Sequence, residues 1–267
     1  MRVNAGGRAV NAGGRAVNAG TILITGASSG LGAEMARQFA ARGYDLALCA
    51  RRLERLEDLR SEIRATHPGC RVEPRTLDVT DDGQVFEVFH AFAADFGAID
   101  RVVVNAGLGK GAALGTGRFD ANRQTAMTNF VGALAQIEAA MEIFRAQQRG
   151  HLVVISSMSA LRGMRKSMTT YAASKAGVAS LAEGLRSELL GKKGIDVSVI
   201  YPGYIRSEMN EHVAQRTRFM VDTETGVRAM VEAIEKRRAK AYVPAWPWVP
   251  ISIAMRTMPL SIVRKLA

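Results

Sequence analysis

Two side chains with acid–base chemistry stand four residues apart in the segment "YAASK". At that spacing Tyr171 and Lys175 would share one face of a helix. A tyrosine hydroxyl, whose pKa is ordinarily about 10, can exchange protons with a reacting group when a nearby cation and oriented polar groups lower that pKa. An i,i+4 Tyr/Lys pair taken alone most often marks a solvated helix face, so its meaning depends on the motifs around it.

A glycine-rich turn near the start of the chain has the features of a phosphate-binding loop. In "TILITGASSGLGAEMARQFAARG" an apolar strand leads into Gly26, Gly30 and Gly32 and then directly into an amphipathic helix. Glycines allow a tight turn and a close approach to a pyrophosphate, and the helix N-terminus offers N–H groups at the positive end of its dipole. The spacing is G-x3-G-x-G rather than the general G-x-G-x-x-G.

An earlier glycine-rich stretch, "VNAGGRAVNAGGRAVNAG", lacks that context. No strand precedes it within the chain, and the element that follows it is a strand rather than a helix. We therefore interpret residues 1–20 as a low-complexity, disordered leader that takes no part in phosphate binding.

The elements that must position these groups alternate between short strands and longer helices. The predicted strands are Thr21–Thr25, Asp45–Ala50, Arg71–Leu77, Arg101–Asn105, His151–Ser156 and Asp196–Tyr201, with a short last strand at Ala241–Val243. Beyond the helix after the glycine turn, the predicted helices are Arg51–Thr66, Asp81–Phe96, Asp120–Gln148, Tyr171–Leu190 and Thr225–Arg238. This alternation predicts an α/β fold over residues 21–240: a single-domain, Rossmann-type doubly wound parallel sheet of about seven strands with helices on both faces.

Motifs that follow one another through residues 21–210 resemble those of the short-chain dehydrogenase/reductase family. They are "TGASSGLG" with Ser28, Ser29 and Leu31 beside its glycines, "LDVTD" with Asp78 and Val79, Asn105–Ala106–Gly107, "TNFVGAL" with Asn129, "VVISS" with Ser157, "YAASK" with Tyr171 and Lys175, and "YPGYIRSEM" with Pro202, Gly203, Ile205 and Ser207. The resemblance implies a nicotinamide cofactor and a reaction that interconverts a carbonyl and an alcohol.

The resemblance also implies how these side chains divide the work. Tyr171 would be the general acid/base, and Lys175 would favour the tyrosinate and hold the nicotinamide ribose. Ser157 would orient the substrate carbonyl, and Asn129 would hold a water in a proton relay beyond Lys175. Contacts to the bound cofactor are implied for the remaining motif residues, among them Asp78 on the adenine side, Ile205 at the carboxamide and Ser207 near the phosphates.

The serine assignment has two rivals. Ser157 lies 14 residues before Tyr171, whereas 13 is the commoner spacing in the family. Ser156 and Ser159 therefore stay open as alternatives, although Ser156 should point to the opposite side of the strand from Ser157.

The end of the second predicted strand favours NADP over NAD. In "LALCARRLERL" no acid stands at the tip of the strand, where one would bind the ribose hydroxyls of NAD, and Arg51 and Arg52 follow at once. Guanidinium groups match phosphate in a planar, bidentate way. Arg51 is the better candidate by its position in the family, and the alternative is that both arginines only solvate the start of a charge-rich helix.

Composition excludes several other classes of protein. The net charge is +11, but its excess lies at the two ends of the chain without aromatic–basic interleaving, which argues against nucleic-acid binding. Two cysteines make no disulfide framework and fit a reducing, cytoplasmic compartment. The four histidines show no ligand spacing, so no metal site is expected, and no run of 18 apolar residues predicts a membrane span.

The C-terminal tail, residues 241–267, begins with the uncharged stretch "AYVPAWPWVPISIAM". Its three prolines predict that no helix forms in its first part. The simpler interpretation is that the tail packs near the substrate cleft or on a partner subunit. The alternative is contact with a membrane surface through Tyr242, Trp246 and Trp248, which would suit a lipid-like substrate.

Together these features predict an NADP-dependent oxidoreductase acting on a small carbonyl or alcohol substrate. The alternatives are a non-catalytic NADP-binding regulatory or scaffold protein and a peripheral membrane reductase. The family resemblance implies a homodimer or homotetramer formed through the helices at 120–148 and 171–190, and a substrate lid at residues 206–224.

Overall fold

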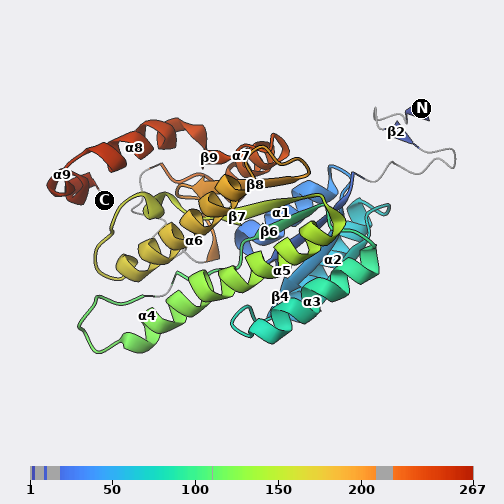
Figure 1. Cartoon of the computed structure of the whole chain (residues 1–267), viewed down its shortest axis with the longest axis horizontal. Helices are drawn as coiled ribbons and strands as arrows, with labels where there is room; N and C mark the ends of the chain where they lie inside the picture. Colours follow the sequence, from blue (N-terminus) through green and yellow to red (C-terminus); the bar gives the residue numbers. More distant parts are fainter. Residues whose placement is uncertain (1, 4–8, 11–18, 110, 209–218, 267) are drawn as a thin grey trace.

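The computed structural model describes residues 2–3, 9–10, 19–109, 111–208 and 219–266. Seven parallel strands form one sheet in the order β5-β4-β3-β6-β7-β8-β9 (Figure 1). The strands are β3 (Thr21–Thr25), β4 (Asp45–Ala50), β5 (Val72–Thr76), β6 (Arg101–Val104), β7 (Gly150–Ile155), β8 (Ile195–Pro202) and β9 (Lys240–Val243). The predicted Rossmann-type sheet is confirmed, and each strand lies within about two residues of its expected bounds.

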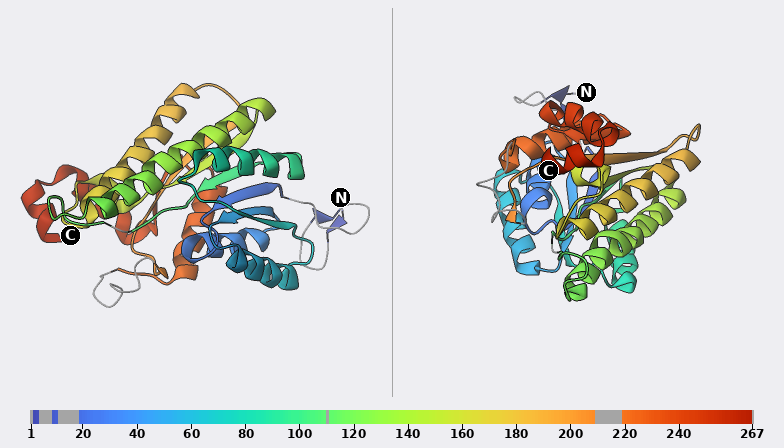
Figure 2. Two further views of the ribbon diagram at one scale, coloured as in Figure 1. Left: turned by 90° about the horizontal axis from the view of Figure 1, so that it is seen from below. Right: turned by 90° about the vertical axis from the view of Figure 1, so that its left-hand side faces the viewer.

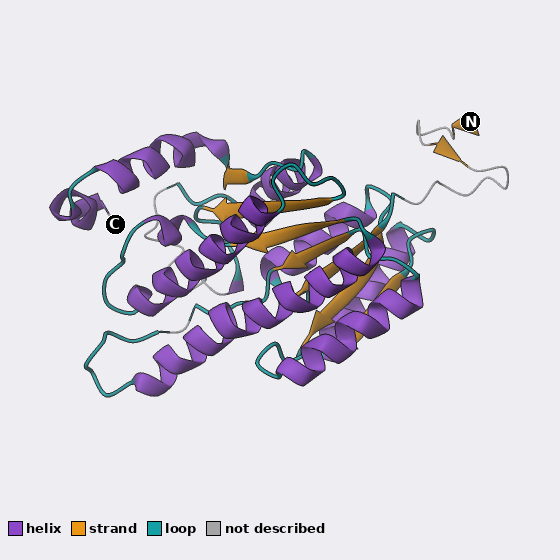
Figure 3. Ribbon diagram, in the orientation of Figure 1, coloured by secondary structure: helices purple, strands orange, loops and turns teal. Residues whose placement is uncertain are grey.

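Helices cover both faces of the sheet (Figure 3). One face carries α1 (Gly30–Ala40), α2 (Leu53–Thr66) and α7 (Thr223–Glu235), and the other carries α3 (Asp82–Phe96), α5 (Gly132–Gln147) and α6 (Met168–Glu188). Successive side chains of a strand point to opposite faces of the sheet. In β3, Ile22 and Ile24 pack against the first set of helices, whereas Leu23 packs against the second. Both layers are visible in the two views of Figure 2, where α5 and α6 run side by side.

The long helix predicted at Asp120–Gln148 is interrupted. It consists of α4 (Phe119–Ala126), a π-helical turn (Met127–Val131) and α5. A Cβ on Gly132, which opens α5, would lie 2.4 Å from the Val79 carbonyl oxygen, so the chain there passes very close to the segment after β5. Single π-turns within helices often occur at functional sites.

The expectation that prolines exclude a helix from the early tail is wrong. After β9 the chain forms α8 (Ala245–Thr257) and α9 (Leu260–Leu266). Trp246 has non-helical dihedral angles, so regular helix starts at Pro247, and Pro250 still falls in the first turn. The first N–H groups of a helix have no intrahelical partner, and proline is tolerated there for that reason.

The two ends of the predicted domain layout are described to different extents. In the predicted leader, β1 (Arg2–Val3) pairs antiparallel with β2 (Ala9–Val10). The other residues of the leader up to residue 18 lie outside the described part of the chain. Residues 209–218 of the predicted lid also lie outside them. At the other end β9 pairs with β8, so the predicted tail contributes the sheet's edge strand and its residues from Pro244 onward lie outside the sheet.

Candidate active site

The turn between β3 and α1 admits only glycine at its closest approaches. A Cβ on Gly32 would lie 2.3 Å from the Gly26 carbonyl oxygen, and a Cβ on Gly26 would lie 2.9 Å from the Ala106 Cα. Ser29 caps α1 without a side-chain hydrogen bond to the helix amides. The turn therefore presents the N-terminus of α1 to the adjacent cleft, which is the arrangement that binds phosphate groups.

The segment after β6 is fastened to this turn. The backbone N–H groups of Asn105 and Ala106 both donate to Thr25 Oγ1 at 3.0 Å, and Asn105 Nδ2 donates to the Thr25 carbonyl at 2.9 Å. Buried Thr25 thus fixes two predicted cofactor-binding segments relative to each other, although they are about 80 residues apart in sequence.

The Tyr/Lys pair lies on the side of α6 that faces the cleft. Lys175 is buried, and its Nζ donates to the Ile155 carbonyl at the end of β7 at 2.8 Å. Burial lowers the pKa of Lys175 to about 8. Burial raises the pKa of Tyr171, a hydrogen bond with the Ser157 side chain acts in the opposite direction, and nearby Tyr204 raises it further. The expected net lowering of the Tyr171 pKa is therefore not found. Desolvation raises the pKa by more than the Ser157 side chain lowers it.

The serine alternatives are separated by their partners. Buried Ser156 donates its hydroxyl proton to the Lys175 carbonyl at 2.8 Å, which ties β7 to α6. Ser159 donates its backbone N–H to Ser157 Oγ at 3.1 Å. Of the three serines, only Ser157 has a side chain that lowers the pKa of Tyr171, through a hydrogen-bonding interaction.

Asn129 lies in the π-helical turn, behind the wall of the cleft. Its Oδ1 accepts from the Leu108 N–H at 2.7 Å, and its Nδ2 donates to the Leu108 carbonyl at 2.8 Å. The side chain therefore fastens the loop after β6. The role predicted for Asn129, holding a relay water, stays a prediction.

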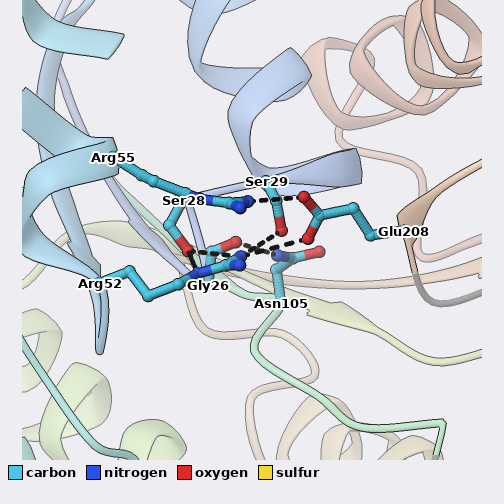
Figure 4. A network of polar contacts seen from close by, with 7 residues as sticks. All are labelled: Gly26, Ser28, Ser29, Arg52, Arg55, Asn105 and Glu208. Atoms are coloured by element: carbon cyan, nitrogen blue, oxygen red, sulfur yellow. Dashed lines mark hydrogen bonds and ion pairs between the residues drawn. The ribbon is translucent and has the colours of Figure 1, made fainter. Parts of the chain in front are cut away.

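At one end of the cleft, arginines from the start of α2 meet the glycine-rich turn (Figure 4). Arg52 Nη2 donates to Ser29 Oγ at 2.9 Å and to Ser28 Oγ at 3.3 Å. Arg52 and Arg55 also form ion pairs with Glu208, at 3.3 and 2.6 Å. Neither Glu208 nor Arg55 was expected here, since no motif contains them as a site residue.

These groups border a single cleft of about 1090 Å³ at the carboxyl ends of the strands. Its lining contains every predicted site residue except Asn129, namely Gly26, Ser28, Ser29, Gly30, Leu31, Gly32, Arg51, Arg52, Asp78, Val79, Asn105, Ala106, Gly107, Ser157, Tyr171, Lys175, Pro202, Gly203, Ile205 and Ser207. Sequence reasoning missed the wall formed by α4 and the π-turn, which consists of Asp120, Arg123, Gln124, Met127 and Thr128. Their spacing places them on one face of the predicted helix, but the face is mostly polar, so the sequence alone does not separate it from a solvated face.

The part of the chain that the structure describes contains no group of three His, Cys, Asp or Glu side chains able to hold a metal ion. Within the same described residues, none of the helices combines the length and apolar character needed to cross a bilayer.

Comparisons with known proteins agree with this geometry. The family model described as short chain dehydrogenase matches residues 20–218. An uncharacterized oxidoreductase of Mycobacterium tuberculosis is 50% identical over 246 residues, covering 92% of this chain and 96% of that protein. Dehydrogenase/reductase SDR family member 7B of Bos taurus is 31% identical over 255 residues, covering 89% of this chain and 77% of that protein.

Two solved structures are similar over almost the whole chain. A short-chain dehydrogenase from Sphingobium yanoikuyae in complex with NADPH has 26% identity and a TM-score of 0.77, with 91% of this chain and 97% of that chain covered. A short-chain dehydrogenase/reductase from Burkholderia phymatum in complex with NAD has 22% identity and a TM-score of 0.79, with 93% and 95% covered, a likeness that shows the fold.

Proposed function

The chain belongs to the short-chain dehydrogenase/reductase family and is an oxidoreductase that uses a nicotinamide cofactor. On that premise we propose that it interconverts a carbonyl and an alcohol with NADP(H), using Tyr171 as general acid/base. One observation carries the proposal. Tyr171, Ser157, whose side chain lowers the pKa of Tyr171, and buried Lys175 border the same cleft as the glycine-rich turn. Proton donor and phosphate cradle are thus held in one cleft, as hydride chemistry on a nicotinamide requires.

The residues present fit such a cofactor. The turn packs closely at Gly26 and Gly32, where a Cβ would clash with backbone atoms, and the N-terminus of α1 that follows it would hold the pyrophosphate. Arg51 and Arg52 would take the 2′-phosphate of NADP(H), and Asp78 with Val79 would border the adenine. The segment Pro202–Ser207 would border the nicotinamide half.

The chain's own groups supply the proton chemistry. When bound, NADPH supplies a hydride to the carbonyl carbon. Tyr171 Oη donates its proton to the carbonyl oxygen, and the resulting tyrosinate is stabilised by the Ser157 hydrogen bond and the Lys175 ammonium. Solvent then returns a proton to Tyr171. The pKa of Tyr171 is raised by burial, so its hydroxyl is protonated at neutral pH and can act as the acid in carbonyl reduction.

The NADP preference rests on the arginines at the start of α2. No acid stands at the tip of β4, and Arg51 and Arg52 both line the cleft. Among similar structures, the Sphingobium protein holds NADPH and the Burkholderia protein holds NAD, so the preference has to be tested on this chain.

A kinetic comparison tests the proposal. A panel of ketones and aldehydes is screened by loss of nicotinamide absorbance, and kcat/KM is then measured for NADPH and for NADH. Arg51→Gln should lower kcat/KM for NADPH at least about tenfold and leave NADH nearly unchanged, because a charge-assisted contact to phosphate is lost. Arg60→Gln, which changes an arginine of α2 that does not line the cleft, should change neither. Equal use of both cofactors by the unmodified enzyme would overturn the preference.

We further propose that the apolar surface of α8 and α9 contacts another surface. Trp246, Ile253 and Leu260 are exposed, and this favours either a membrane surface or a partner subunit. The expected membrane anchors are corrected in part: Trp248 is buried and Tyr242 packs against Tyr201, which leaves Trp246 alone of the three exposed. Flotation with anionic liposomes and sedimentation, each repeated on Ile253→Ser, distinguish a membrane from the predicted homodimer or homotetramer.

A further inference from the structure

An acidic side chain occupies the arginine cluster at the adenosine end of the cleft. Glu208 comes from the segment after β8, and Arg52 and Arg55 come from the start of α2, more than 150 residues earlier. We propose that Glu208 is a specificity-determining residue that competes with the 2′-phosphate of NADP(H) for these arginines. This inference rests on the proposed function, since it concerns how the same cleft chooses its cofactor.

The contacts place a carboxylate where an anionic ligand would be bound. Glu208 Oε1 accepts from Arg55 Nη1 at 2.6 Å, and Glu208 Oε2 accepts from Arg52 Nη2 at 3.3 Å (Figure 4). One carboxylate thus bridges two guanidinium groups, which is also how a phosphate engages paired arginines. The same Arg52 nitrogen donates to the hydroxyls of Ser28 and Ser29. The Glu208 bridge is therefore joined to the glycine-rich turn that is proposed to bind the phosphates.

Glu208 is charged at neutral pH. Its pKa is lowered from the ordinary range of a glutamate, first by the hydrogen bond from Arg55 and also by hydrogen bonds with Arg52 and Ser29. An ionised carboxylate repels a phosphate dianion, so NADP(H) can engage Arg52 fully only after Glu208 has moved away. NAD(H) carries a ribose hydroxyl at that position, and a hydroxyl can donate to the carboxylate without displacing it.

The ion pairs are weak enough to exchange. The side chains of Arg52, Arg55 and Glu208 are 41%, 45% and 52% exposed, so solvent and salt screen their attraction. Arg51 borders the same cleft and, among the described residues, makes no ion pair with an acid. Arg51 can therefore receive the phosphate first, and Arg52 follows when Glu208 is displaced. No acid stands at the tip of β4 itself, and Glu208, although distant in sequence, brings a carboxylate next to the arginines that follow this strand.

The test is the cofactor affinity of Glu208→Gln, which keeps the shape of the side chain and removes its charge. Dissociation constants for NADPH and NADH are measured by isothermal titration calorimetry on the full chain, at low and at high salt. The variant should bind NADPH about two- to fivefold more tightly than the unmodified protein and NADH no more tightly, a size set by exposed ion pairs. The gain should shrink at high salt because screening weakens the competing ion pairs.

Glu62→Gln is the matched control. Glu62 is an exposed glutamate that pairs with Arg37 at 2.7 Å outside the cofactor cleft, so the variant has the same net charge as Glu208→Gln. If the control gains NADPH affinity equally, or if Glu208→Gln leaves the NADPH-to-NADH affinity ratio unchanged, the competition does not exist. An unmodified protein that binds NADH more tightly than NADPH would refute the proposed cofactor preference, while the Glu208 inference would still be decided by the change in the ratio.

Discussion

Polar side chains are buried at both ends of the sheet, but the two ends use them differently. At the carboxyl end, Tyr171 and Lys175 border an open cleft of about 1090 Å³. At the amino end, Arg101 and His151 are enclosed by α7 and the neighbouring strands, away from that cleft. The first arrangement leaves reactive groups available to a ligand, and the second pairs the buried Arg101 and His151 with other groups of the protein.

Within the amino-end network Arg101 and His151 are buried and closed off from solvent, whereas the Glu235 side chain at its edge is 33% exposed. Arg101 Nε donates to His151 Nδ1 at 3.0 Å, and Arg101 Nη1 pairs with Glu235 at 2.6 Å. Since Nδ1 accepts the hydrogen bond from Arg101, Nε2 carries the hydrogen of the neutral ring and donates to Ser198 Oγ at 2.8 Å. Glu235 also accepts from the Tyr44 hydroxyl.

A shifted pKa does not by itself distinguish the two ends. Burial lowers the pKa of Lys175 to about 8 and lowers the pKa of His151 to about 3, with Arg101 adding to the effect on His151. Desolvation is the main cause in both cases. What differs is access: Lys175 lines the cleft and His151 does not. A perturbed group therefore indicates a functional site only where it also faces a ligand-sized space.

Removing one tyrosine hydroxyl at each end gives the largest contrast. Tyr171→Phe should lower kcat for carbonyl reduction by about 10³, because general acid catalysis contributes 10²- to 10⁴-fold, while the dissociation constant for NADPH stays the same. Steady-state kinetics and calorimetric titration measure the two quantities.

The matched variant at the amino end is Tyr44→Phe. It removes the hydroxyl that donates to Glu235 at 3.0 Å and should leave kcat within about twofold. Turnover that persists in Tyr171→Phe would refute the acid/base assignment, and an equal loss in both variants would point to misfolding.

The second contrast concerns stability. Arg101→Leu should lower the free energy of unfolding by about 2 kcal/mol, because the buried His151 Nδ1 loses its donor. The Glu235 carboxylate also loses its ion pair, but it is partly exposed and still accepts from the Tyr44 hydroxyl. Urea unfolding followed by circular dichroism measures the loss. Activity per folded molecule should not change, since Arg101 does not border the cleft.

Lys175→Met should behave in the opposite way. Its burial disfavours the charged form, so removing the ammonium should cost little stability, whereas carbonyl reduction should fall sharply. Loss of activity without loss of stability in Arg101→Leu would show that the two ends of the sheet are coupled.

The sequence predicted the parts of the site that depend on local chain properties. Buried parallel strands are short runs of apolar residues, and the turn from β3 to α1 depends on Gly26 and Gly32, whose positions admit no Cβ. Tyr171 and Lys175 share a face because helix periodicity alone determines it. These predictions needed no knowledge of distant contacts.

The missed features depend on contacts between distant segments. "MTNFV" fits a regular helix, and the π-turn there coincides with the bonding of Asn129 to Leu108 across 21 residues. The Glu208 ion pairs join segments more than 150 residues apart. The helix after Pro244 differs from the prediction for another reason: proline is tolerated in the first turn of a helix, where the N–H groups have no intrahelical partner.

The smallest expected effect is a pH dependence that belongs to the amino end. The pKa of His151 is lowered from 6.5 to about 3 in the folded protein, so the unfolded chain takes up a proton as pH falls through 6.5 and the folded protein does not. The stability contribution of His151 is therefore complete above pH 6.5 and declines progressively as pH falls towards 3.

His151→Gln removes this titration. Between pH 7.5 and 5.5 the unmodified protein should lose about 1 kcal/mol more unfolding free energy than His151→Gln does, measured by urea unfolding at both pH values. His67→Gln, which changes a surface histidine at the end of α2, should follow the unmodified protein over the same range. Parallel curves for His151→Gln and the unmodified protein would mean that the imidazole is already charged when folded. Arg101 then could not donate to Nδ1, because both ring nitrogens of a charged imidazole are donors, and the amino end would no longer be the closed counterpart of the cleft.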